Sequence, residues 1–204
     1  MGAVLLSHCP VPRWVQSAAA ELKKQILSAG VSMDSLINKN PRFLDTSKLR
    51  PIPLNQFGTM GLNEYAFDSR VWRLQVTGQV EKPLSLSMDD ILKLPIFEKN
   101  VLMICPGVFA NFGHWKGISI AQLLDTAQAD SHSTHITIRG PEGPDEKSKR
   151  FSVSDIQKDA VFLAYEINGQ KLPQKHGYPI RAVAEGYFGF DWIKFVHKIE
   201  VDKI

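Results

Sequence analysis

The stretch VLMICPGVFANFGHWKG, residues 101–117, joins an apolar run that ends at Cys105 to a Pro-Gly pair and a series of aromatic residues. Residues 100–105 predict a buried strand, because a short, continuous apolar run is typical of a strand covered on both faces. Pro106 and Gly107 then require a turn, and we expect an aromatic-containing loop from there to Trp115. Cys105 therefore stands at a strand end, where the strand fixes the sulfur and the turn leaves one side open.

Cys105 has two readings at this point. Free cysteines are among the most buried residue types, and a silent thiol in the core is the plainer interpretation. A thiolate held at the mouth of a pocket is the other, since partly exposed cysteines near cations can act as nucleophiles or metal ligands. The surrounding stretch alone leaves both open.

Composition favours one globular domain. The chain has 204 residues, of which 44% are hydrophobic and 22% are charged, and no apolar run approaches the roughly 20 residues that span a bilayer. A net charge of +3, from scattered Lys and Arg, argues against a nucleic-acid-binding surface. With Cys9 as the only other cysteine, we expect no disulfide framework.

The N-terminal part, residues 1–60, is predicted to be a helix and a wrapping loop that form one structural unit with residues 61–204. Apolar residues recur at helical spacing over residues 12–29 and predict an amphipathic helix that ends at Gly30. Residues 38–61 are irregular and rich in proline, which fits either a surface loop or a functional one. The first residues lack a basic segment, a twin arginine and a small-residue cleavage site.

The remainder is rich in predicted strands. Asn168-Gly169 is a strong hairpin-turn signal, and the charged residues 140–150 are expected to face solvent. Because short helices interrupt the strands without regular strand-helix alternation, the pattern indicates an α+β fold with a mixed sheet. GxGxxG, Walker, CxxC and HExxH motifs are all missing, which removes the commonest nucleotide and zinc readings. We expect strands at residues 71–76, 100–105, 135–139, 161–167, 180–184 and 193–201, and short helices after Ser87, Ser119 and Ser152.

A second cluster of chemistry-bearing residues follows the last hairpin. His176 and Arg181 flank a turn that enters a strand, and Gly186, Gly189 and Lys194 follow around the next turn. Glycines let backbone amides approach a ligand, while Arg and Lys neutralise a phosphate. Each residue alone is as well explained as a turn residue or a solvated charge, so only the grouping indicates a phosphate-binding site.

Taken together, these motifs resemble the molybdopterin-binding domain of the sulfite oxidase family, and in particular its compact bacterial branch with methionine sulfoxide reductase catalytic subunits. The resemblance runs from about residue 71 to residue 201. The motifs that carry it are Cys105, Trp115-Lys116-Gly117, Leu123-Leu124, LAYEING at residues 163–169, Leu172-Pro173, HGYPIR at residues 176–181, Gly189 and Ile193-Lys194.

This resemblance implies the sulfite-oxidase-type fold and one molybdopterin per molybdenum, with no haem or flavin in this chain. Cys105 would be the thiolate ligand of the metal. The cofactor-binding residues that it implies are His176, Arg181 and Lys194 for the pterin and its phosphate, backbone groups at Gly186 and Gly189, Asn55 and Phe57 from the N-terminal loop, and the backbone of Gly140.

For the reaction, the resemblance implies a molybdenum oxidoreductase, and we expect oxygen-atom transfer on a small S-oxide or N-oxide. Residues 106–113 contain no arginine, whereas sulfite oxidases surround the metal with arginines. Asn111 and His114 are candidates to donate a hydrogen bond to a reacting oxo group, with Phe109 and Phe112 in the pocket wall. Electrons would come from an external partner, such as a cytochrome, a quinone-linked protein or a flavin protein.

Two alternatives stay open: a sulfite oxidase-like enzyme, and a non-catalytic molybdopterin-binding module. The cysteine argues against the module, because pterin phosphate can be held without a metal thiolate. The compartment is also open, being periplasmic by resemblance and cytoplasmic if the chain has no leader.

Overall fold

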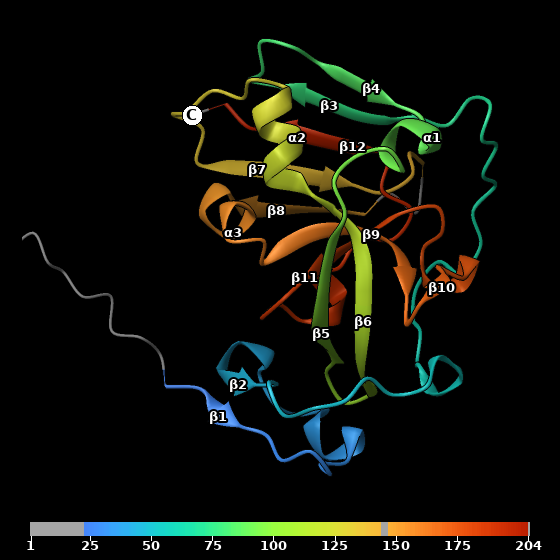
Figure 1. Ribbon diagram of the computed structural model, residues 1–204, viewed down its shortest axis with the longest axis vertical. Helices are drawn as coiled ribbons and strands as arrows, with labels where there is room; N and C mark the ends of the chain where they lie inside the picture. Colours follow the sequence, from blue (N-terminus) through green and yellow to red (C-terminus); the bar gives the residue numbers. More distant parts are fainter. Residues whose placement is uncertain (1–22, 144–146, 204) are drawn as a thin grey trace, which may run out of the picture.

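Two five-stranded sheets form the body of the molecule (Figure 1). The structure, a computed structural model, describes residues 23–143 and 147–203. The first sheet is antiparallel throughout and is organised on a long hairpin. In spatial order its strands are β10 (Gln170–Lys171), β9 (Val161–Ile167), β6 (Phe109–Ser119) and β5 (Phe97–Cys105), and β11 (Arg181–Ala184) also pairs with β9.

The second sheet mixes strand directions, because β12 pairs parallel with β3 while the other pairs are antiparallel. Two sheets with few short helices confirm the predicted α+β class. In spatial order the strands are β4 (Leu84–Leu86), β3 (Leu74–Gly78), β12 (Lys198–Val201), β7 (His135–Arg139) and β8 (Ser148–Ser152).

Three short α-helices begin where the sequence predicted. Each follows a serine whose hydroxyl accepts a backbone N–H of the first turn and so satisfies a donor that the helix itself cannot pair. The apolar side of α2 packs into the core through Ile120, Leu123 and Leu124. The helices are α1 (Met88–Ile91) after Ser87, α2 (Ile120–Thr126) after Ser119 and α3 (Val153–Gln157) after Ser152.

The hairpin of β5 and β6 corrects the loop predicted between Cys105 and Trp115. Only three residues reverse the chain: Cys105 pairs directly with Phe109, and the Val108 N–H donates to the Cys105 carbonyl at 3.0 Å. Gly107 supplies the positive φ, +73°, that this tight turn needs. The aromatic residues beyond the turn belong to a strand because they continue the pairing with β5, and Phe112 and Trp115 are almost completely buried.

The described part of the N-terminal segment packs against this hairpin. The predicted helix over residues 12–29 is wrong for residues 23–29, where β1 (Gln25–Ile26) pairs parallel with β2 (Leu44–Asp45); the rest of that helix lies outside the described residues. Pairing with a distant strand therefore overrides the helical spacing. Apolar residues from this segment form a separate cluster with the hairpin: Leu27, Leu36, Leu44 and Leu49 with Leu102, Ile104, Ala110 and Phe112.

Several boundaries differ from the predictions. The strand expected over residues 71–76 is β3, which begins three residues later, and the last predicted strand forms only in its second half, as β12. The loop expected over residues 140–150 is shorter, since its last three residues join β8. Single-turn 3-10 helices occupy Met33–Leu36, Pro41–Phe43, Leu54–Gln56, Gln174–His176 and Gly189–Asp191.

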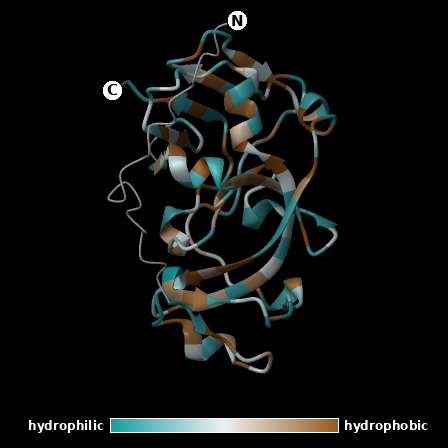
Figure 2. Ribbon diagram, turned by 60° about the vertical axis from the view of Figure 1, so that its left-hand side comes forward, coloured by the Kyte–Doolittle hydropathy of each residue, from teal (hydrophilic) through white to brown (hydrophobic). Residues whose placement is uncertain are grey.

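In Figure 2 the hairpin strands carry brown, hydrophobic stretches. Some of these side chains belong to the main hydrophobic core, among them Val101, Met103 and Trp115. Among the helices in the described residues, none has the length and apolar character required to cross a membrane.

Candidate active site

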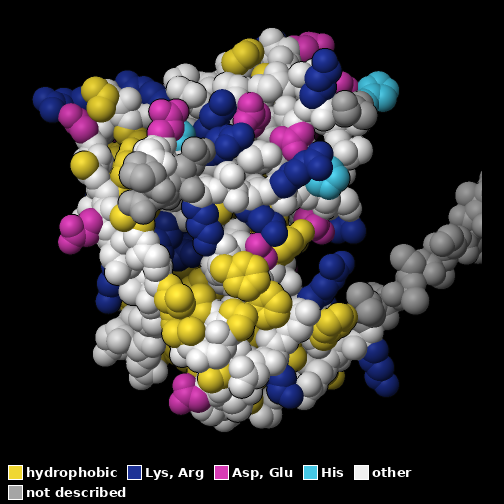
Figure 3. Space-filling model, turned by 180° about the vertical axis from the view of Figure 1, so that it is seen from behind, with side chains coloured by type: hydrophobic (Ala, Val, Ile, Leu, Met, Phe, Trp, Pro, Cys, Tyr) yellow, Lys and Arg dark blue, Asp and Glu magenta, His cyan; other side chains and the backbone are white. Residues whose placement is uncertain are grey.

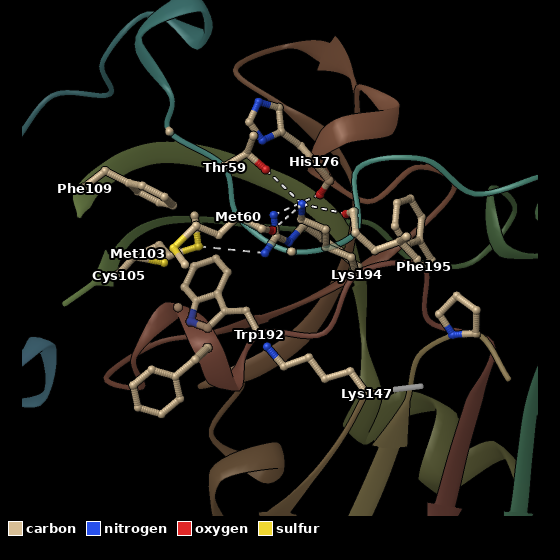
Figure 4. Close-up of a pocket in the computed structure, with 17 residues that line it drawn as sticks. Thr59, Met60, Met103, Cys105, Phe109, Lys147, His176, Trp192, Lys194 and Phe195 are labelled. Atoms are coloured by element: carbon tan, nitrogen blue, oxygen red, sulfur yellow. Dashed lines mark hydrogen bonds between the residues drawn. The ribbon is translucent and has the colours of Figure 1, made fainter. Parts of the chain in front are cut away.

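A cavity of about 360 Å³ lies at the turn end of β5. Cys105 is the last residue of that strand, and its side chain faces the cavity although the residue is only 8% exposed. Segments from distant parts of the chain complete the wall (Figure 4). The lining residues are Gly58, Thr59, Met60, Gly61, Leu62, Met103, Cys105, Phe109, Pro141, Lys147, His176, Arg181, Gly189, Phe190, Trp192, Lys194 and Phe195.

Gly189 makes the closest approach to the Cys105 sulfur. An isolated parallel bridge between Ile104 and Phe188 brings the 3-10 turn Gly189–Asp191 beside the end of β5. A Cβ at position 189 would lie 2.6 Å from the Cys105 Sγ, a separation that real Cβ atoms do not tolerate. The absence of a side chain at Gly189 therefore leaves the room that the sulfur occupies.

Arg181 is a buried cation on the cavity wall. It begins β11, is 2% exposed, and its guanidinium lies 5.2 Å from the Trp115 ring centroid and 5.3 Å from that of Trp192. Its Nη1 donates to the His176 carbonyl at 2.9 Å, and its Nη2 lies 3.8 Å from the Met103 sulfur. Burial lowers the pKa of Arg181 to about 10, which the Cys105 sulfur partly opposes, so the group stays charged at neutral pH.

His176 contributes a neutral ring to the same wall. The side chain is 1% exposed and packs edge-on against Phe57 at 6.0 Å between ring centroids. Burial, followed by the charges of Arg181, Lys175 and Lys194, lowers the pKa of His176 to about 4. Within the described residues its Nε2 is buried without a hydrogen-bond partner. A buried polar atom on a cavity wall is costly unless it meets a ligand or water, so this nitrogen marks a contact point for one.

Lys194 reaches across the cavity to the segment of residues 59–63. Its Nζ lies 2.9 Å from the Thr59 Oγ1, 2.8 Å from the Met60 carbonyl oxygen and 3.0 Å from the Leu62 carbonyl oxygen. Burial, then Arg181 and Lys147, lowers the pKa of Lys194 to about 8.

Lys147 is a cavity residue that the sequence reading missed. The sequence predicts a solvent-facing loop at this position, yet the side chain extends toward Trp192 in Figure 4 and the carbonyl accepts the Gly140 N–H at 2.8 Å. Burial lowers the pKa of Lys147, against the opposing effect of Asp191. Nothing in this charged stretch distinguishes Lys147 from Lys149, so the sequence carries no signal for its place in the cavity.

The thiol and the cations act on one another. Burial raises the pKa of Cys105, and Arg181, Lys147 and Lys194 each oppose that rise. The thiol is therefore protonated at neutral pH in the chain by itself. A metal ion would replace the proton, because thiolate is the form that coordinates.

Two residues predicted for catalysis do not line the cavity. The Asn111 side chain is fully buried and bonds to both backbone groups of Gly58, at 3.0 Å to its nitrogen and 2.9 Å to its oxygen. The His114 ring lies toward the other end of the hairpin, with Nδ1 2.9 Å from the Asn100 Oδ1 and Nε2 3.4 Å from the Glu98 Oε2. Asn111 thus supports the wall through Gly58.

Four residues predicted to bind the cofactor also lie outside the cavity lining. Phe57 is buried behind His176, and Asn55 is exposed on the preceding 3-10 turn. Gly140 is packed between backbone atoms of Lys147 and Lys194. Gly186 borders another depression of the surface, beside Arg42. The remaining predicted residues, Cys105, His176, Arg181, Gly189 and Lys194, come together on the cavity wall.

A thiol that shares a cavity with lysine and arginine side chains suits a ligand that carries negative charge and a soft metal. The comparison with known families makes this specific. Residues 62–203 match the oxidoreductase molybdopterin binding domain, which covers more than half of the chain. The chain belongs to this family, and it is a molybdopterin-binding oxidoreductase domain.

Curated relatives agree with this assignment. The protein-methionine-sulfoxide reductase catalytic subunit MsrP of Gluconobacter oxydans is 29% identical over 145 residues, which cover 64% of this chain and 46% of that protein. The subunit of the same name in Campylobacter jejuni is 26% identical over 151 residues, which cover 67% of this chain and 51% of that protein. This chain therefore spans about half the length of these relatives. A nitrate reductase of Lotus japonicus is 27% identical over 79% of this chain and 21% of its own length.

A solved structure shows the same fold. The sulfane dehydrogenase SoxCD from Paracoccus pantotrophus superposes with a TM-score of 0.63 at 20% sequence identity, over 99% of this chain and 56% of that one. The sulfite-oxidase-type fold predicted from the sequence is confirmed.

The cavity residues fit a molybdenum cofactor. Cys105 offers a soft sulfur ligand, which suits a redox-active metal. Arg181 and Lys147 line the cavity and can offer charge to a phosphate, and the unpaired Nε2 of His176 offers a hydrogen-bonding group.

Proposed function

We propose that this chain holds one molybdenum-molybdopterin in the cavity and transfers an oxygen atom from a small S-oxide or N-oxide. The observation that carries the proposal is the position of the Cys105 sulfur, which shares the cavity lining with the cations Arg181 and Lys147. A thiol and cations on one wall match a ligand that brings both a metal and a phosphate.

Cys105 is the metal ligand in this proposal. Its place at the end of a nine-residue strand, with Gly189 against it, fixes the sulfur before the metal arrives. When bound, molybdenum supplies the two-electron redox chemistry that breaks and forms bonds to oxygen. The protein must release the thiol proton as the metal enters, and the cations opposite Cys105 favour that release.

Arg181, Lys147 and His176 hold the pterin and its phosphate. In the described chain the hydrogen bonds of Arg181 run to carbonyl oxygens and to the Met103 sulfur, and none runs to a carboxylate. Its charge is therefore available to an incoming anion, and the dry surroundings strengthen that attraction. His176 is neutral at physiological pH, so its ring offers a hydrogen bond rather than a charge.

The rim of the cavity favours an apolar, neutral substrate. Met60, Leu62 and Phe190 line the cavity and are 55%, 38% and 56% exposed. Figure 3 shows hydrophobic side chains gathered beside Lys and Arg side chains on one face. A thioether S-oxide would place its carbon groups on such a rim. Its reduction takes two electrons and two protons and yields the thioether and water.

The electrons come from an external redox partner in this proposal, either a cytochrome, a quinone-linked protein or a flavin protein. The chain itself carries no haem or flavin in this view. Reduction of the substrate therefore needs the partner, or a reduced dye in its place.

Sulfite oxidation is the second candidate, and Lys147 is the observation that favours it. The residues after Cys105 carry no arginine, but Lys147 adds a cation to the cavity that could attract a small oxyanion. Oxidation of a reduced dye by sulfoxides, set beside reduction of an acceptor by sulfite, separates the two. Turnover of sulfite alone would replace the first candidate with the second.

Metal content tests whether the chain is an enzyme or a non-catalytic binding module. We expect about one molybdenum per chain in the native protein, with loss of metal and of activity in Cys105→Ala. Cys9→Ser is the matched control, since it removes the other thiol. A folded Cys105→Ala protein that keeps its molybdenum and its activity would refute the ligand assignment.

A further inference from the structure

Residues 58–63, here called the strap, form one wall of the cavity. Five of them, Gly58 to Leu62, line it directly. In the chain the strap lies between the 3-10 turn Leu54–Gln56 and β3. It contacts residues more than a hundred positions later, as the Thr59–Lys175 hydrogen bond shows. Asn111 anchors one end through the two backbone groups of Gly58, and the Thr59 hydroxyl donates to the Lys175 carbonyl at 3.0 Å.

Lys194 joins the strap to the opposite wall. Its Nζ has four oxygen neighbours, all from the strap: the Thr59 Oγ1, the carbonyl oxygens of Met60 and Leu62, and the Asn63 Oδ1 at 3.2 Å. Figure 4, which does not draw Asn63, shows the hydrogen bonds to the other strap oxygens as dashed lines that meet at the ammonium. The Thr59 hydroxyl also lies 3.3 Å from the Asn63 Oδ1, so the contacts of the strap meet at one point.

The ammonium has no donor left for another ligand. A lysine carries three N–H bonds, and four acceptors already surround this one. Hydrogen bonds from a charged donor are stronger than those between neutral groups, so the cluster is the firmest attachment of the strap between Thr59 and Asn63. While the strap is in place, a phosphate in the cavity would have to compete with it for Lys194.

We propose that Lys194 is a positioning residue that fastens the strap as a wall of the cofactor cavity, so that releasing its ammonium opens this side. The inference deepens the proposed function by assigning Lys194 to the wall rather than to the phosphate. Cofactor binding then relies on Arg181, Lys147 and His176 as long as the strap is closed.

The hydrogen bonds between Lys194 and the strap, here called the latch, can be tested by limited proteolysis of the full chain without cofactor. Chymotrypsin can cut after Leu62 within the strap, and mass spectrometry identifies the cut. Charge-assisted hydrogen bonds worth about 1.5–3 kcal/mol correspond to a roughly 10- to 100-fold rise in cleavage for Lys194→Gln, if opening precedes the cut. Lys194→Arg keeps the charge but replaces the compact ammonium with a planar guanidinium, so we expect a cleavage rate between those of the wild type and Lys194→Gln.

Lys147→Gln is the matched control. It removes a positive charge from the same cavity, and the described structure gives its side chain no hydrogen bond to the strap. We expect wild-type cleavage at the strap for this variant. Equal acceleration in both glutamine variants would mean that cavity charge, and not the latch, governs the strap, which overturns the proposal.

A strap-side substitution covers the case in which Lys194→Gln does not fold. Asn63→Ala removes one of the four acceptors and leaves both Lys194 and the Thr59–Lys175 hydrogen bond intact. Faster cleavage after Leu62 in a protein that melts like the wild type supports the latch, and an unchanged rate overturns it. Because cleavage is measured without cofactor, a failed latch leaves the molybdenum measurement unaffected, and the reverse also holds.

Discussion

Replacing Gly189 with alanine is expected to displace the Cys105 sulfur from its place in the cavity wall. The added Cβ would lie 2.6 Å from the Cys105 Sγ, 3.2 Å from the Met103 Cγ and 3.4 Å from the Ile104 carbonyl oxygen. Non-bonded heavy atoms ordinarily sit about 3.5–4.0 Å apart, so the sulfur and the new methyl group must separate by about 1 Å. The φ of Gly189 lies outside the left-handed range, so the effect comes from this contact and not from backbone strain.

The energetic cost follows from over-packing at a tight site. Inserting a methyl group into a well-packed interior typically costs about 1–3 kcal/mol, and the 2.6 Å contact places Gly189→Ala within that range. Chemical denaturation of the cofactor-free chain measures this loss. Molybdenum content of the native protein should fall as well, because ligand distances in metal sites are fixed to within about 0.2 Å.

A double-mutant cycle identifies the sulfur as the cause. In Cys105→Ala the Sγ is absent, so Gly189→Ala should cost at least about 1 kcal/mol less there than in the wild type. Gly30→Ala is the control, since nothing lies within 4 Å of a Cβ at that position. Equal costs of Gly189→Ala in both backgrounds would refute the reasoning, because the energy would then come from Met103 or the backbone.

Three further outcomes are expected. The pKa of His176 is about 4 in the folded chain, below the ordinary value near 6.5, so the unfolded chain binds more protons between these two pH values. The free energy of unfolding should therefore fall by on the order of 3 kcal/mol as the pH drops from 6.5 to 4. His176→Gln should flatten this part of the plot of unfolding free energy against pH. Asn111→Ala should cost about 2–4 kcal/mol in chemical denaturation, because it leaves both backbone groups of Gly58 unpaired, whereas Asn55→Ala on the surface should be nearly neutral. Lys147→Gln should lower molybdenum loading by several-fold at limiting cofactor through lost attraction to phosphate, and unchanged loading would remove Lys147 from the cofactor site.

Much of the fold follows from local signals in the sequence. Serine caps marked the starts of the three helices, and the predicted strand at His135–Arg139 has the bounds found in β7. Asn168-Gly169 forms the predicted hairpin turn, with φ of +50° and +72°. Each of these features depends on a few neighbouring residues, which is why the sequence alone could reveal them.

The errors arose where distant contacts decide the structure. Pro106-Gly107 predicts the start of a long loop, but pairing along the whole of β5 makes the residues after the turn a strand. Gln25 and Ile26 pair with β2 instead of forming a helix. In both places an inter-strand ladder, which sequence spacing does not report, overrides the local pattern.

The candidate site also contains residues that local motifs predict correctly to lie together and residues that strand pairing places elsewhere. Linked motifs predict Cys105, His176, Arg181, Gly189 and Lys194 as site residues, and the structure brings all five to the lining of one cavity. Asn111 and His114 were grouped with them because they follow Cys105 closely in the chain. Once residues 109–119 form a strand, distance along the chain becomes distance along the hairpin, and His114 is carried toward its far end.

Among the residues that the structure describes, few acidic groups compensate the charges of Arg181, Lys147 and Lys194 in the cavity. Arg181 and Lys147 each lower the pKa of Lys194, and among the groups that oppose these shifts are Asp191, which acts on Lys147, and the Cys105 sulfur, which is protonated in the chain alone. Buried cations without matching anions destabilise a fold, and they persist where a ligand restores the balance. An anionic cofactor would bring the negative charge of its phosphate to the cations, and its metal would turn Cys105 into a thiolate, which is the second negative charge. The electrostatics of the wall and the sulfur at its end therefore favour the same ligand, which neither a phosphate alone nor a metal alone would satisfy.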